Sequence, residues 1–237
     1  MSLMNRVRSA TVYSLALALV LACAHAPPSI PLNHRRLPVV QDRGLYQRLV
    51  RTDPEKRMVD LRQVDPAIAL DIRYATPDNF MKRVLYPAPR AFLRAPAAAA
   101  LREVQRELRS EGLGLKVYDA YRPYRITEEM WEPFKDPDYV ADPARGSRHN
   151  RGAAVDVTLV DAETGVELPM PTPYDNFTNR AAHAFTELDP AVIANRAKLR
   201  EVMERHGFVP LPSEWWHYDF AGWEKFELMD LSFDEIQ

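Results

Sequence analysis

Histidine and carboxylate residues recur in two short segments of the chain, residues 147–156 and 214–218. The first segment holds His149 and, seven residues later, Asp156; the second holds Glu214 and, three residues later, His217. Two imidazoles and one carboxylate can bind Zn²⁺ and leave its fourth position open to water. Glu214 would then be the base that takes a proton from this water. The pattern predicts the chemistry of a zinc-dependent hydrolase.

The elements that must position these residues can be read from hydrophobic periodicity and turn residues. Apolar residues at helical spacing predict a helix over 97–111, and Asp189-Pro190 starts a second helix that ends at 206–207. Strands are expected at 115–118, 152–160 and 215–220, which places Asp156 on a strand and His149 in the loop before it. Helices and strands mix without a regular βαβ alternation. This favours an α+β fold with a central, largely antiparallel sheet flanked by helices.

The three-residue spacing of Glu214 and His217 conflicts with a regular strand. Side chains three apart on a strand point to opposite faces of the sheet. Both residues can reach one metal only if Glu214 lies in the turn before the strand or at a bulge. Pro212-Ser213, just upstream, makes a turn plausible.

Length and composition bound the class of protein. The chain has 237 residues, of which 46% are hydrophobic and 27% charged, and its formal net charge is −2. This suits one globular domain, placed at 43–237, and argues against a nucleic-acid-binding protein. No feature of the sequence indicates an obligate protein partner.

The N-terminal residues have the pattern of an export signal. Arg6 and Arg8 precede an apolar run that is too short to span a bilayer, so residues 1–22 are expected to be a signal peptide. The run ends at Val20-Leu21-Ala22-Cys23, which resembles a bacterial lipobox, and Cys23 is the only cysteine in the chain. We therefore expect lipidation of Cys23, a Pro-rich tether over 23–42, and a membrane-anchored lipoprotein in the periplasm or at the cell surface. The alternative is a chance cysteine in an ordinary signal.

Several segments together resemble a known family. The motif Ser147-x-His149-x-x-Gly152-x-Ala154-x-Asp156, followed by Glu214-x-Trp216-His217, is similar to the zinc D,D-peptidases, a hedgehog-like fold. Tyr74-Ala75-Thr76-Pro77-Asp78-Asn79-Phe80, Asp119-Ala120-Tyr121-Arg122-Pro123 and the 170–175 segment resemble blocks of its D-alanyl-D-alanine dipeptidase branch, the VanX-type enzymes. The likeness runs from about residue 65 to residue 220.

The resemblance implies a role for each of the matching residues. His149, Asp156 and His217 would bind one Zn²⁺ ion, with Glu214 as the base and Arg122 as the stabiliser of the oxyanion. The remaining matches are expected to contact or orient the substrate: Tyr74 and Asp175 near its ammonium group, Ser147 near its carboxylate, and Asp119 against the arginine. Tyr86, Trp131 and Phe134 are candidate aromatic walls of the pocket.

Three functions stay open at this point. The leading expectation is a zinc dipeptidase that cleaves D-Ala-D-Ala, a small D-amino-acid dipeptide, in cell-wall turnover or scavenging, with antibiotic resistance as a further role. The second is a D,D- or L,D-carboxypeptidase or endopeptidase that trims peptidoglycan stem peptides. The third is a non-catalytic, zinc-stabilised binding module, against which the presence of Glu214 and Arg122 argues.

Overall fold

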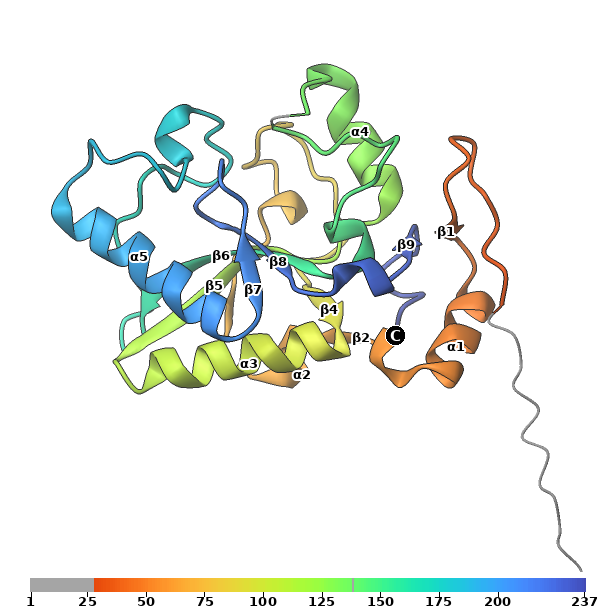
Figure 1. Ribbon diagram of the computed structural model, residues 1–237, viewed down its shortest axis with the longest axis horizontal. Helices are drawn as coiled ribbons and strands as arrows, with labels where there is room; N and C mark the ends of the chain where they lie inside the picture. The colour runs from red at the N-terminus through yellow and green to blue at the C-terminus, as the bar shows by residue number, and fades with distance from the viewer. Residues whose placement is uncertain (1–27, 138) are drawn as a thin grey trace, which may run out of the picture.

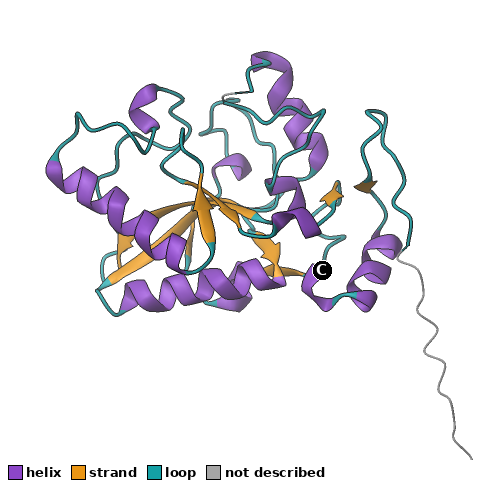
Figure 2. Cartoon of the chain, in the orientation of Figure 1, coloured by secondary structure: helices purple, strands orange, loops and turns teal. Residues whose placement is uncertain are grey.

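The computed structural model describes residues 28–137 and 139–237, and its centre is a five-stranded sheet (Figures 1 and 2). The strands lie in the order β3-β5-β6-β8-β7. Only β3 and β5 are parallel, and the other neighbours are antiparallel. This confirms the predicted α+β class and the largely antiparallel sheet. The bounds of the five strands are Ala69–Leu70 (β3), Leu113–Asp119 (β5), Ala154–Asp161 (β6), His217–Phe220 (β8) and Phe208–Pro210 (β7).

Strand β6 is the most deeply buried strand of the sheet. Its first seven residues are all buried, as expected for a central strand rich in β-branched residues. The strand begins two residues later than predicted, because Gly152 has a left-handed backbone (φ 65°) and ends the 3-10 turn η3, His149–Arg151. This turn places His149 directly before the strand that carries Asp156.

The two long helices confirm the sequence prediction and pack beside the sheet. Helix α3, Ala95–Arg109, has Pro96 in its first turn and buries its apolar face, and helix α5, Pro190–Arg205, begins at the predicted cap. The Asp189 carboxylate accepts a hydrogen bond from the backbone N–H of Ala191 at 2.8 Å. Figure 1 shows α3 below the sheet and helix α4, Tyr124–Phe134, above it.

The remaining helices and strands are short and were not predicted. Helix α1 covers Arg43–Thr52 and α2 covers Leu61–Val64. Two small two-stranded sheets pair β1, Val39–Val40, with β9, Leu228–Met229, and β2, Met58–Asp60, with β4, Phe92–Arg94. Four further 3-10 turns lie at Pro54–Lys56, Arg73–Ala75, Asn179–Ala181 and Trp223–Lys225.

The N-terminal part of the domain starts earlier than predicted. Val39 and Val40 have no exposed surface and pair in parallel with Leu228 and Met229, so they belong to the folded core rather than to a free tether. The predicted boundary between tether and domain at residue 43 is therefore too late. The predicted signal peptide, 1–22, and the lipidation site, Cys23, lie outside the described residues. Within the described ranges, no helix is long and apolar enough to span a bilayer.

Candidate active site

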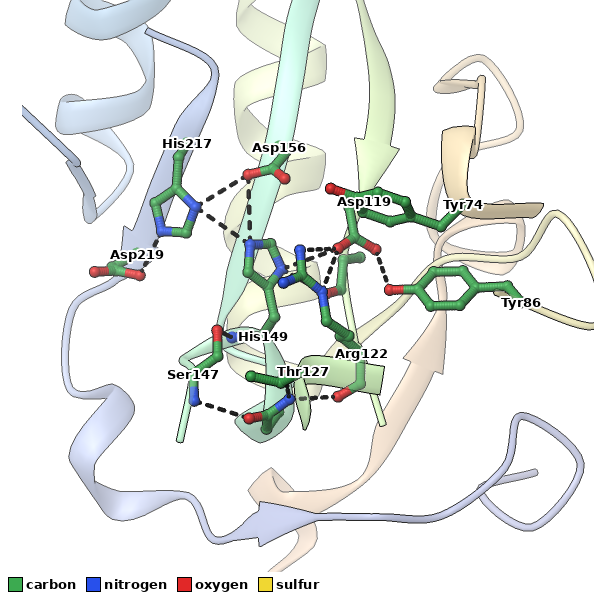
Figure 3. Close-up of polar contacts among 12 residues, drawn as sticks. Tyr74, Tyr86, Asp119, Arg122, Thr127, Ser147, His149, Asp156, His217 and Asp219 are labelled. Atoms are coloured by element: carbon green, nitrogen blue, oxygen red, sulfur yellow. Dashed lines mark hydrogen bonds and ion pairs between the residues drawn. The ribbon is translucent and has the colours of Figure 1, made fainter. Parts of the chain in front are cut away.

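His149, Asp156 and His217 converge on one point at the end of the central strands (Figure 3). The Asp156 Oδ1 atom lies 3.0 Å from His217 Nδ1 and 3.4 Å from His149 Nε2, and the two ring nitrogens are 3.2 Å apart. The register of the sheet pairs Asp156 on β6 directly with His217 on β8, and the η3 turn supplies His149. All three side chains are buried.

The other polar atom of each of these side chains has a partner outside the cluster. His149 Nδ1 donates to the Ala120 carbonyl oxygen at 2.7 Å, and His217 Nε2 donates to Asp219 Oδ1 at 2.9 Å. Asp156 Oδ2 accepts from the Tyr174 hydroxyl at 2.8 Å. These outer contacts assign the ring protons to the outward nitrogens and fix the orientation of each group, as in protein metal sites.

The inward atoms of the cluster fit a tetrahedral metal ion. With their protons on the outer nitrogens, both rings present a lone pair to Asp156 Oδ1, and that oxygen has no hydrogen bond among the described residues. A cation bound between three such acceptors would stabilise the cluster. Tetrahedral bonds of about 2.0–2.1 Å separate neighbouring ligands by about 3.3 Å, close to the distances found here. The donor set of two imidazoles and one carboxylate leaves a position free for water or substrate.

Glu214 lies beside this cluster, in the turn that precedes β8. Residues 212–216 are not part of a strand, and the His217 backbone N–H donates to the Glu214 carbonyl across the turn. Because Glu214 lies in a turn, its three-residue spacing from His217 does not conflict with the two-residue period of a strand. For the same reason β8 begins at His217 and is shorter than predicted. Burial raises the pKa of Glu214 to about 7, helped by the negative charge of Asp156 and opposed by His217. A carboxyl group with this pKa can exchange a proton near neutral pH.

Arg122 reaches the same pocket from the chain segment after β5. Its Nε and Nη2 atoms donate to Asp119 Oδ2 at 3.1 and 2.8 Å, and Tyr86 donates to the other oxygen of that carboxylate at 2.7 Å. The guanidinium carbon also lies 5.2 Å from the centre of the Tyr74 ring. Asp119 is completely buried and holds the arginine in one orientation.

Tyr74 and Asp175 meet in the same pocket. The Tyr74 hydroxyl oxygen is 3.1 Å from both carboxyl oxygens of Asp175. Burial, together with the negative charge of Asp156, holds the pKa of Asp175 well above its ordinary value. A cationic group bound beside Asp175 would offset the energetic cost of burying its charge and favour the ionised carboxylate.

A cavity of about 440 Å³ joins these groups. Ser147 lines it and fixes the η3 turn, because its hydroxyl oxygen accepts from the His149 backbone N–H at 3.2 Å. The aromatic walls differ from the prediction: Tyr86, Trp131 and Phe134 are not among the lining residues, and Tyr86 instead holds Asp119. The apolar part of the wall includes Phe80, Met130, Val140, Phe177 and Trp216.

The structure places the nine predicted catalytic, metal and substrate residues in one region, eight of them lining the cavity and Asp119 directly behind it. Sequence reasoning missed Asp219 and Tyr174. Asp219 follows His217 by two residues on β8, so strand alternation could have placed both on one face. Tyr174 lies in a loop without periodicity, and no local pattern indicates its contact with Asp156.

Comparisons with known proteins show which family this chain resembles. The family model Peptidase M15, described as D-Ala-D-Ala dipeptidase, matches residues 54–233. The D-alanyl-D-alanine dipeptidase of Escherichia coli (strain K12) is 36% identical over 162 residues, which cover 68% of this chain and 83% of that protein. The D-alanyl-D-alanine dipeptidase of Enterococcus faecium is 31% identical over 181 residues, covering 67% and 88%. The one from Streptomyces coelicolor is 32% identical over 171 residues, covering 64% and 85%. The family model covers most of the chain and includes the polar cluster, so the chain belongs to the D-Ala-D-Ala dipeptidase family of M15 peptidases.

Proposed function

We propose that this protein hydrolyses the dipeptide D-Ala-D-Ala to D-alanine, using one Zn²⁺ ion held by His149, Asp156 and His217. Family membership supports the reaction, and the convergence of three unprotonated ligand atoms supports the metal. The observation that carries the dipeptide specificity is the position of Tyr74 and Asp175. Both line the same cavity as the metal cluster, and the Tyr174 hydroxyl links Tyr74 to Asp156.

Glu214 would move the proton that the reaction requires. When bound, zinc would supply Lewis-acid polarisation of the peptide carbonyl and make water more acidic. The Glu214 carboxylate accepts a proton from the attacking water and donates it to the departing amine nitrogen as the C–N bond breaks.

Arg122 would stabilise the negative charge that develops on the carbonyl oxygen. Asp119 holds its Nε and Nη2 atoms, and Arg122 lines the cavity, so the guanidinium keeps one orientation beside the substrate position. A preoriented cation of this kind stabilises a developing oxyanion without reorganisation during the reaction.

Asp175 would select substrates with a free amino end. The ammonium group of a dipeptide compensates the buried carboxylate, whereas the neutral amide of a longer peptide leaves it unpaired. This contact favours a dipeptidase over a carboxypeptidase that trims stem peptides.

Hydrolysis of D-Ala-D-Ala by the zinc-loaded protein tests the proposal, with N-acetyl-D-Ala-D-Ala and a stem pentapeptide as comparison substrates. We expect cleavage of the free dipeptide alone, and loss of at least about a hundredfold in kcat for Glu214→Gln. Cleavage of the blocked or longer substrates would instead identify a wall-trimming carboxypeptidase. Zinc binding without cleavage of any substrate would identify a binding module.

We also propose that the protein is exported and anchored by a lipid on Cys23, and that it recovers D-alanine from cell-wall peptides. The support is the sequence alone: an apolar run preceded by arginines and ending at the single cysteine. An anchored enzyme outside the cytoplasm meets wall fragments rather than the precursor pool, which favours scavenging. Cell fractionation of the unmodified protein and a Cys23→Ser variant tests the anchor.

A further inference from the structure

Tyr174 lies between the metal cluster and the amine end of the pocket. Its hydroxyl oxygen is 2.8 Å from Asp156 Oδ2 and 3.2 Å from the Tyr74 hydroxyl, which in turn is 3.1 Å from Asp175. The metal cluster and Asp175 are therefore joined by an unbroken row of four oxygen-bearing side chains: Asp156, Tyr174, Tyr74 and Asp175. Asp175 has a left-handed backbone (φ 58°), and it follows Tyr174 directly, so one loop supplies two members of the row.

Each tyrosine of the row has a single hydroxyl hydrogen, which limits the hydrogen bonds that the row can form at one time. Tyr174 has one hydroxyl hydrogen, which goes to the carboxylate of Asp156, its shortest contact. Its oxygen can then only accept from Tyr74. Tyr74 also has one hydrogen and can donate it either to Tyr174 or to Asp175. If Asp175 accepts the Tyr74 hydrogen, the Tyr174 oxygen receives no hydrogen bond from Tyr74. Whether it receives one changes how strongly Tyr174 donates to Asp156.

The ring of Tyr174 has little freedom to move its hydroxyl elsewhere. It stacks on Tyr118 with ring centres 4.6 Å apart and an interplanar angle of 25°, and Trp216 contacts it edge to face at 5.5 Å. Tyr118 and Trp216 are buried, at 2% and 1% exposure. These contacts depend on the ring and not on the hydroxyl, so removal of the oxygen alone leaves the packing in place.

We propose that Tyr174 is a positioning residue whose hydroxyl orients Asp156 for the metal and couples the metal cluster to the amine-binding end of the pocket. This inference rests on the proposed function, because it takes Asp156 as a metal ligand and Asp175 as the amine partner. It gives the Tyr174 hydroxyl a role in both metal affinity and dipeptide recognition.

Zinc affinity of the Tyr174→Phe variant tests the first part, measured by competition with a chromophoric chelator. Outer hydrogen-bond partners of metal ligands are typically worth ten- to a hundredfold in affinity, so we expect the dissociation constant to rise about tenfold. The matched control is Tyr118→Phe, which removes a hydroxyl from the other ring of the same stack and outside the row. Its zinc affinity should equal that of the unmodified protein. Equal zinc affinity of Tyr174→Phe and the unmodified protein would overturn the positioning role.

A double-mutant cycle with Tyr74→Phe tests the coupling. In the presence of the Tyr174 hydroxyl, Tyr74→Phe should weaken zinc binding, whereas in the Tyr174→Phe background it should have no further effect. Additive effects of the two substitutions would show that no coupling passes through Tyr174. With saturating zinc, Tyr174→Phe should raise KM for D-Ala-D-Ala more than it lowers kcat, and an unchanged KM would contradict the link to the amine end.

Failure of the inference and failure of the proposed function give different results. If the unmodified protein does not bind zinc, the metal assignment itself is wrong. If it binds zinc but does not cleave D-Ala-D-Ala, the activity is wrong, while the zinc affinities of the variants still test the position of Asp156. If it binds zinc and cleaves the dipeptide but Tyr174→Phe matches it in both, only the role of Tyr174 is removed.

Discussion

Glu214 illustrates how a catalytic requirement can oppose stability. Its carboxyl group is largely buried next to Asp156, and no hydrogen bond to its side chain is present among the described contacts. Burial without such a partner disfavours the ionised form and raises the pKa of Glu214 to about 7, from 4.5 in the unfolded chain. The folded protein therefore binds this proton more tightly than the unfolded protein does.

Linkage predicts a pH-dependent gain in stability for Glu214→Gln. Because the pKa is raised on folding, Glu214 causes the free energy of unfolding to fall as pH rises from about 4.5 to about 7. In the Glu214→Gln variant, no group at this position titrates, so this fall in the free energy of unfolding is absent. We expect the free energy of unfolding of the variant, minus that of the unmodified protein, to increase by about 1–3 kcal/mol from pH 4.5 to pH 8.

Urea unfolding of the metal-free protein at these two pH values measures the difference. Zinc must be absent, because its charge would lower the pKa of a neighbouring carboxyl group. A stability difference between the two proteins that is the same at both pH values would show that Glu214 titrates normally in the folded state.

At the scale of elements, the η3 turn and β6 form the unit that sets the distance between His149 and Asp156. Gly152 joins them with φ 65°, and a Cβ atom added there would lie 2.5 Å from Met58 Cε and 2.7 Å from its Sδ. The Gly152 carbonyl also accepts a hydrogen bond from the Arg94 backbone N–H at 2.8 Å. The left-handed backbone therefore favours glycine, and a Cβ atom at this position would also force the end of the Met58 side chain to move.

Gly152→Ala should destabilise the protein and weaken metal binding. The left-handed backbone alone costs about 1–2 kcal/mol for a residue with a Cβ atom, and displacement of Met58 adds to this cost. Gly165→Ala is the matched control, because Gly165 has a similar φ of 70° but nothing lies within 4 Å of an added Cβ atom.

Thermal unfolding and zinc titration of the two variants separate the two contributions. The control should show only the backbone cost and an unchanged zinc affinity. Equal losses of stability in the two variants would mean that the contact with Met58 is accommodated without cost.

At the scale of the whole molecule, the folded core includes residues that precede the first helix. Val39 and Val40 pair with Leu228 and Met229, so segments from the two ends of the described chain lie side by side (Figure 1). The chain already contacts the core at Ile30, a partly buried residue that packs against it. Few residues thus separate Cys23 from the folded domain, and an anchor at Cys23 would hold the domain close to the membrane surface.

Cys23→Ser tests the anchor in the full chain. We expect the unmodified protein in the membrane fraction of an expressing bacterium, extractable by detergent, and the serine variant in the soluble fraction. Both should have the same activity, because the substitution is far in sequence from the site residues. Equal distribution of the two proteins between the fractions would remove the lipid anchor from the proposal.

The sequence by itself determined the types of residue at the site and the main elements that carry them. The metal pattern could be read because His149 and Asp156 are seven residues apart in one segment. The two long helices could be predicted because the Asp189 cap and the apolar spacing of α3 are local signals. The α+β class followed from the same local patterns.

Only the tertiary structure decided which atoms meet. The pairing of Asp156 with His217 depends on the register of β6 and β8, and the contact of Tyr174 with Asp156 depends on a loop without periodicity. The pairing of Val39 with Leu228 likewise joins residues far apart in the chain. Periodicity and turn chemistry report interactions between residues close in sequence, whereas these contacts form when distant segments pack together, and no local pattern encodes them.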